Sequence, residues 1–133
     1  MGLSFIIIDD SELDCFIARK IIAHADKNIA IHPFQNALHA LEFITSKPVD
    51  DEEGMTVILL DLQMPLMNGF EFVEEFEQLP VKLKNRHTIV MLSSTRNTND
   101  ISKIKSYKSI RSRLEKPLTL EKLFPLMQLK TYT

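Results

Sequence analysis

The sequence predicts an α/β domain built on a doubly wound parallel sheet of five strands, with helices on both faces. Short apolar runs alternate along the chain with longer segments in which apolar residues recur at helical spacing. The runs are almost continuously apolar, as strands buried on both faces require. With 133 residues, 44% of them hydrophobic and 26% charged, the chain fits one compact domain, which we expect to span residues 1–133.

The N-terminal part of the chain contains two predicted strands, each followed by a helix. Residues 3–8 (LSFIII) are too few for a helix and rich in β-branched side chains, so they predict the first strand. Ser11 is the predicted N-cap of the first helix, with Asp14 three residues later. A second strand is expected over residues 29–34, and the apolar stripe of the next helix consists of Ala37, Leu38, Leu41 and Ile44.

The central part of the chain contains the strongest strand. Residues 47–55 include a proline, four consecutive acids and a glycine, which predict a solvated loop. The strand over residues 56–60 (TVILL) follows and leads directly to Asp61. Gly69 opens the next helix, whose apolar positions are Phe72, Val73 and Phe76.

The C-terminal part of the chain contains the remaining two strands. Residues 79–87 are predicted to connect to a strand over residues 88–92, and a polar turn over residues 94–99 leads into a helix. The last strand, around residues 112–115, has weak strand propensity. Thr119 is the predicted N-cap of a final helix, which Pro125 should kink or shorten because it lacks a backbone donor.

Composition excludes several classes of protein. The formal net charge is -2 and the pI is near 6.1, so we do not expect a nucleic-acid binder, which would usually be basic. Cys15 has no second cysteine to pair with, and no segment resembles a signal peptide or the ~20 apolar residues of a membrane span. These features predict a cytoplasmic protein that does not bind a membrane.

Polar side chains follow the predicted strands at one edge of the sheet. Asp9 and Asp10 follow the first strand, Asp61 the third, Ser93 the fourth and Lys116 the last. Open parallel sheets bind ligands beyond the carboxyl ends of their strands, where the strand order reverses. We therefore expect these five side chains to line one crevice.

The chemistry of this group points to phosphoryl transfer. Three carboxylates in one crevice repel one another, and a divalent cation is the simplest way to neutralise them. Oxygen ligands without a nearby cysteine or histidine favour Mg²⁺ over zinc. Asp61 can then attack phosphorus as a carboxylate nucleophile, while the Lys116 ammonium and the Ser93 hydroxyl neutralise and position the phosphoryl group.

Four features of the sequence together resemble a known family. They are Asp9-Asp10, the segment 61–69 (DLQMPLMNG), Ser93 after an apolar strand, and Lys116-Pro117. This pattern is similar to that of the receiver domains of bacterial two-component systems, particularly single-domain regulators of the chemotaxis type, and the similarity covers residues 3–127.

The resemblance implies a flavodoxin-like sheet in the order 2-1-3-4-5, with Asp61 as the phosphoacceptor. It also implies that Mg²⁺ is held by Asp9, Asp10, Asp61 and the backbone carbonyl of Gln63. The bond between Lys116 and Pro117 is often cis in this family, which would aim the lysine at the site.

The function expected from this resemblance is signalling, with self-catalysed phosphorylation and dephosphorylation of the protein's own aspartate as the only catalysis. A histidine kinase or a histidine phosphotransfer protein would supply the phosphoryl group, and an unidentified output protein would recognise the result. One alternative is an adaptor whose binding does not depend on phosphorylation. A second is an aspartyl-nucleophile phosphatase, which is disfavoured because position 63, where such enzymes place a second aspartate, is Gln63.

Departures from the family concern the output of the signal. Receivers usually have Tyr or Phe three positions before the lysine, and this chain has Arg113. Residues 96–116 hold seven Lys or Arg against two acids, so we expect a basic output face that includes Lys105 and Lys108. Because a guanidinium is hard to bury, we expect Arg113 to point outward as a further contact on this face.

Overall fold

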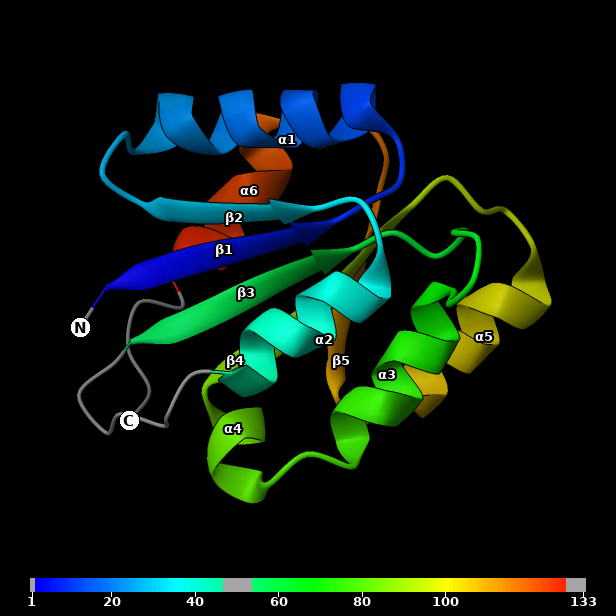
Figure 1. The fold of residues 1–133 in the computed structure, drawn as a ribbon. Coiled ribbons are helices and arrows are strands. Elements are labelled where there is room, and N and C mark those ends of the chain that lie inside the picture. Colours follow the sequence, from blue (N-terminus) through cyan, green and yellow to red (C-terminus); the bar gives the residue numbers. More distant parts are fainter. Residues whose placement is uncertain (1, 47–53, 129–133) are drawn as a thin grey trace.

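The computed structural model of the chain describes residues 2–46 and 54–128. Within them, five strands and six helices alternate along the chain (Figure 1). The strands are β1 (Leu3–Ile8), β2 (Ala30–Phe34), β3 (Met55–Leu60), β4 (His87–Ser93) and β5 (Ile110–Glu115). The helices are α1 (Glu12–Ala25), α2 (Ala37–Ser46), α3 (Gly69–Glu77), α4 (Val81–Asn85), α5 (Thr98–Ser106) and α6 (Leu120–Met127). The acidic run of the predicted loop, residues 50–53, lies outside the described residues.

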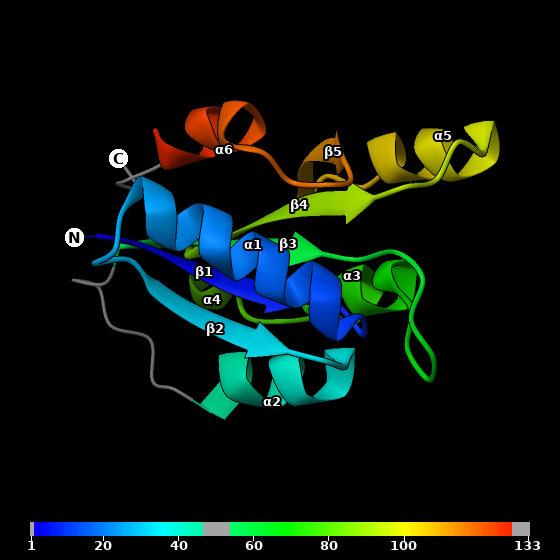
Figure 2. The ribbon, with the colours of Figure 1, turned by 90° about the horizontal axis from the view of Figure 1, so that it is seen from above.

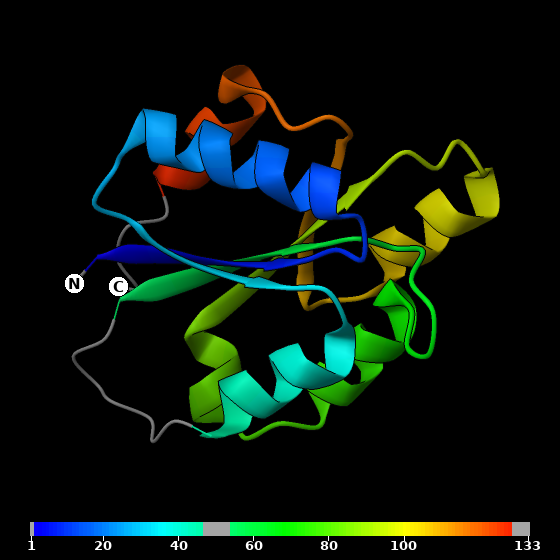
Figure 3. The ribbon, with the colours of Figure 1, turned by 45° about the horizontal axis from the view of Figure 1, so that its top comes forward.

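The strands form one parallel sheet in the order β2-β1-β3-β4-β5, which confirms the predicted topology. Helices α1 and α6 cover one face of the sheet, and α2, α3, α4 and α5 lie on the other face (Figures 2 and 3). The strand order reverses between β1 and β3, so the carboxyl ends of these two central strands mark the place where a ligand is expected.

Two hydrophobic cores sandwich the sheet, because successive side chains of each strand point to opposite faces. In β1, Phe5 and Ile7 pack with α1 and α6, whereas Ile6 and Ile8 pack with the helices of the other face. All four side chains are buried. This burial on both sides explains why the central strands are almost continuously apolar.

Two elements differ from their predictions. The expected connector over residues 79–87 contains the short helix α4, which the sequence analysis did not predict; none of its five residues is buried. Strand β5 begins at Ile110, earlier than expected, and its pairing with β4 shifts between Ile89 and Val90. An irregular edge strand of this kind leaves a weak sequence pattern.

The helix caps largely follow the sequence. Ser11 Oγ accepts a hydrogen bond from the backbone N–H of Asp14 at 3.2 Å, and Thr119 caps α6 in the same way. Pro125 lies inside α6, which continues past it to Met127. No helix in residues 2–46 or 54–128 combines the length and the apolar character needed to cross a bilayer.

Candidate functional site

The candidate site lies at the carboxyl ends of β1, β3, β4 and β5. Backbone hydrogen bonds continue the sheet past the strand ends and hold the site residues in register. Asp61 N donates to the carbonyl of Ile8 at 2.9 Å, and Lys116 N donates to the carbonyl of Ser93 at 2.9 Å. The side chains of Asp9, Asp10, Asp61, Ser93 and Lys116 line one crevice, as the sequence predicted.

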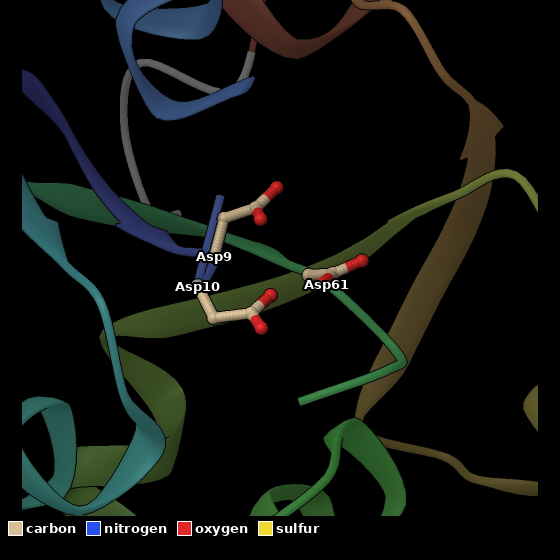
Figure 4. A group of neighbouring side chains, drawn as sticks. All are labelled: Asp9, Asp10 and Asp61. Carbon is tan, nitrogen blue, oxygen red and sulfur yellow. The ribbon is translucent and has the colours of Figure 1, made fainter. Parts of the chain in front are cut away.

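The carboxylates of Asp9, Asp10 and Asp61 converge in this crevice (Figure 4). One oxygen from each lies within 4.8 Å of the other two. Asp9 and Asp61 are buried, whereas Asp10 is exposed at the mouth. Three oxygen ligands with one side open to solvent suit a hard divalent cation that keeps some of its water.

Lys116 lies against these acids and neutralises part of their charge. Its Nζ atom lies 2.8 Å from Asp9 Oδ2, 2.8 Å from Asp14 Oδ2 and 3.2 Å from Asp61 Oδ1. The sequence analysis did not predict the contact between Lys116 and Asp14, because it assigned Asp14 only to the N-terminal cap of the first helix. The backbone N–H of Ser11 donates instead to Asp9 Oδ1, at 2.9 Å, and the Asp14 carboxylate faces the lysine.

The electrostatics of the crevice disfavour three ionised acids. The pKa of Asp61 is raised from an ordinary 3.8 to about 6, chiefly by burial and then by the negative charge of Asp9, although the nearby Lys116 ammonium lowers it. Burial also raises the pKa of Asp9, against the hydrogen bond from Lys116. Burial lowers the pKa of Lys116, but its bonds to Asp14 and Asp9 outweigh this and keep the pKa above the ordinary value. A cation at the acids would therefore be bound favourably.

Ser93 contributes a hydroxyl that has no partner of its own. Its Oγ atom is buried and accepts or donates no hydrogen bond among the described residues, although the residue lines the crevice beside Asp61. A buried polar atom without a partner is unfavourable unless a ligand satisfies it. The hydroxyl therefore fits a site for an oxygen-rich group, such as a phosphoryl group bound to Asp61.

Comparison with known proteins identifies the family. A family model described as the response regulator receiver domain matches residues 5–128. The chain belongs to this receiver family.

Solved receivers share the fold over nearly the whole chain. The receiver protein of Dyadobacter fermentans is 35% identical, with a TM-score of 0.85 and 96% of each chain covered. Relatives found by sequence span different shares of their own lengths. The response regulator Rcp1 of a Synechocystis species is 26% identical over 125 residues, which are 92% of this chain and 82% of Rcp1. The autoinducer 1 sensor kinase/phosphatase LuxN of Vibrio campbellii is 30% identical over 120 residues, which are 89% of this chain but only 12% of LuxN.

Gly69 allows close packing beneath the proposed phosphoacceptor of this receiver. A Cβ atom on Gly69 would lie 2.8 Å from the backbone oxygen of Asp61 and 3.0 Å from the Cα of Leu62. The Gly69 N–H also donates to the Leu62 carbonyl at 2.9 Å. A side chain at this position would push α3 away from the segment that carries Asp61, which explains the glycine in the motif.

Arg113 does not point outward, so that prediction was wrong. Its Nη2 atom donates to the backbone carbonyl of Thr95 at 2.8 Å, and its Nε atom is buried with no hydrogen-bond partner among the described residues. The carbonyl, in the loop between β4 and α5, gives the half-buried guanidinium a hydrogen-bond partner. Arg113 therefore ties β5 to the loop that follows Ser93.

The other residues named from the sequence lie on the basic face or at the crevice. Lys105 and Lys108 are exposed on and just after α5, which leaves them accessible on the basic face. The bond between Lys116 and Pro117 is cis, as the resemblance implied. Gln63 is exposed and lines the crevice. Coordination by its backbone carbonyl stays a prediction.

Proposed function

We propose that this receiver accepts a phosphoryl group on Asp61 in the presence of Mg²⁺ and that phosphorylation switches its binding to an output protein. The proposal rests on the groups that surround the Asp61 carboxylate. They combine a group of acids that suits a cation, the Lys116 ammonium at 3.2 Å, and the unpartnered Ser93 hydroxyl in the same crevice. These are the components that phosphoryl transfer requires.

The proposed donor is a phosphohistidine of a histidine kinase or of a histidine phosphotransfer protein. An oxygen of Asp61 forms a bond to phosphorus as the P–N bond breaks, and the donor histidine keeps the electron pair and takes up a proton. Lys116 Nζ, 3.2 Å from Asp61 Oδ1, would neutralise one phosphoryl oxygen on Asp61, and the Ser93 hydroxyl in the same crevice would donate a hydrogen bond to another. A cytoplasmic location, as predicted from the sequence, is part of this proposal.

The acids Asp9, Asp10 and Asp61 are the proposed ligands of Mg²⁺, with the Gln63 carbonyl as a further ligand. Bound Mg²⁺ would neutralise the negative charge that accumulates on the phosphoryl oxygens. The converging oxygens of the three acids support this assignment. The related regulator Rcp1 is known in an Mn²⁺-bound form, which supports a divalent cation with oxygen ligands at the corresponding place in this chain.

Phosphorylation can be tested with the purified chain, saturating Mg²⁺ and acetyl phosphate. We expect intact mass spectrometry to show one added phosphoryl group on the native protein and none on Asp61→Asn, because the amide lacks the attacking anionic oxygen. Uptake by Asp61→Asn at the native rate would refute the assignment. Uptake by neither protein would instead favour the adaptor whose binding does not depend on phosphorylation.

The basic face is the proposed output surface, and its partner is an acidic protein surface. The exposed cations Lys105 and Lys108 carry this proposal, whereas Arg113 is left out of it because its half-buried guanidinium already donates to the Thr95 carbonyl. Opposite charges chiefly increase the rate of association, and salt screens this effect. Reversal of Lys105 and Lys108 to Glu should slow association with the native partner and remove its salt dependence, without changing phosphorylation of Asp61. If the association rate does not depend on salt and is the same for the native protein and the variant, the partner binds another surface.

A further inference from the structure

Asp14 has no role in the proposed function, yet it contacts Lys116 as closely as Asp9 does. Asp14 Oδ2 and Asp9 Oδ2 both lie 2.8 Å from Lys116 Nζ, and Asp61 Oδ1 lies 3.2 Å from it. An ammonium group has three N–H donors and no acceptor, and Lys116 forms an ion pair with each of these three carboxylates, including a hydrogen bond to Asp14 Oδ2. Lys116 is therefore held by three acids at once.

This inference rests on the proposed function, in which two of the three acids also bind the cation or the phosphoryl group. Asp9 and Asp61 belong to the group that suits a cation, and Asp61 is also the proposed phosphoacceptor. A cation bound at these carboxylates shares them with Lys116 and weakens their attraction for the ammonium. Asp14 does not belong to that group, so its carboxylate stays available to Lys116.

The local structure directs the Asp14 side chain towards the lysine. Asp14 lies in the first turn of α1, where its backbone N–H donates to Ser11 Oγ at 3.2 Å. Its carboxylate is not needed by the cap, because the N–H of Ser11 is already bonded to Asp9 Oδ1 at 2.9 Å. The Asp14 carboxylate is thus free to reach Lys116, which lies 102 positions further along the chain.

We propose that Asp14 is a positioning residue that keeps the Lys116 ammonium at the crevice while Asp9 and Asp61 engage the cation and the phosphoryl group. One of the three partners of the lysine then stays unchanged. Lys116 can exchange Asp61 Oδ1 for a phosphoryl oxygen without leaving its place. A fixed ammonium acts on the phosphoryl group without a further ordering cost.

The test compares Asp14→Asn with Glu12→Gln in the full chain. Glu12 is an exposed acid in the same helical turn, so its replacement removes the same charge without a loss at Lys116. At saturating Mg²⁺ with acetyl phosphate, we expect Asp14→Asn to slow phosphorylation by about tenfold, whereas Glu12→Gln stays near the native rate. Asp14→Glu, which keeps a carboxylate, should recover part of the lost rate.

A second measurement reports the position of the lysine directly. In ¹⁵N-labelled protein with Mg²⁺, we expect the Lys116 ammonium signal to be protected from solvent in the native protein and in Glu12→Gln, and to be lost in Asp14→Asn. A purely structural role of Asp14 would not single out this signal.

The outcomes separate this inference from the proposed function. If the native protein takes up no phosphoryl group, the proposed function fails and the role of Asp14 fails with it. If the native protein is phosphorylated but Asp14→Asn matches Glu12→Gln in rate, or keeps the Lys116 signal, only the role of Asp14 is refuted.

Discussion

Replacement of Asp61 by Asn should stabilise the metal-free protein near neutral pH, although Asp61 is the proposed site of chemistry. The side chain is buried, and its carboxylate shares the crevice with Asp9 and Asp10. These surroundings raise the pKa of Asp61 from 3.8 to about 6, with burial as the main cause. An amide of nearly the same shape carries no charge and avoids the cost of ionisation in this place.

The size and pH dependence of the effect follow from the pKa shift. The folded protein binds the Asp61 proton more tightly than the unfolded chain, so stability is lost as the pH rises from about 4 to about 6. A shift of about two units corresponds to a penalty of up to about 3 kcal/mol above pH 6. This shift already includes the opposing attraction of Lys116, and the amide group of Asn needs hydrogen-bond partners of its own, so we expect Asp61→Asn to add about 1–3 kcal/mol at pH 7.5 and almost nothing below pH 4.

The assay is urea unfolding in EDTA at several pH values, with Glu42→Gln as the control. Glu42 is an exposed acid on α2, far along the chain from the crevice residues, so its replacement changes the net charge alone. Addition of Mg²⁺ should stabilise the native protein more than Asp61→Asn, because the variant lacks one ligand. Equal or lower stability of metal-free Asp61→Asn at pH 7.5 would refute the view that this carboxylate is held at a cost.

Three further substitutions test individual contacts. Ser93→Ala should leave stability nearly unchanged, because the hydroxyl has no partner in the described structure, but should slow phosphorylation by about tenfold; an equal phosphorylation rate would count against a role for the hydroxyl. Arg113→Met should cost about 1 kcal/mol and speed hydrogen exchange in the loop around Thr95, which unchanged exchange would contradict. Gly69→Ala should lower the free energy of unfolding by about 1–3 kcal/mol, since its Cβ would lie 2.8 Å from the Asp61 carbonyl; a variant of native stability would show that α3 shifts freely.

The sheet and the main site could be predicted from sequence because each depends on a local signal. The apolar run of β3 leads directly to Asp61, and the rule for parallel sheets then brings Asp9, Ser93 and Lys116 to the same edge. The helix α4 carried no such signal, because none of its five residues is buried.

The contacts that sequence analysis missed join distant parts of the chain. Asp14 reaches Lys116 across 102 positions, and its place after Ser11 already had a sufficient explanation as a helix cap. Arg113 was expected at the surface because its charge disfavours burial, but the carbonyl of Thr95 offers it a partner that only the folded chain supplies. The sequence did contain an indication of this contact. Asp14 lies in the first turn of α1, close to the end of β1 that carries Asp9, and an acid there could be expected near the crevice.

The central claim, that Asp61 receives the phosphoryl group, can be tested most directly by trapping the product. Borohydride reduces an acyl phosphate to an alcohol, so an aspartyl phosphate becomes homoserine while unmodified carboxylates do not react. After phosphorylation with Mg²⁺ and acetyl phosphate, we expect peptide mass spectrometry to find homoserine at position 61. Homoserine at Asp9, Asp10 or any other position, or none in protein that has gained a phosphoryl group, would contradict the account.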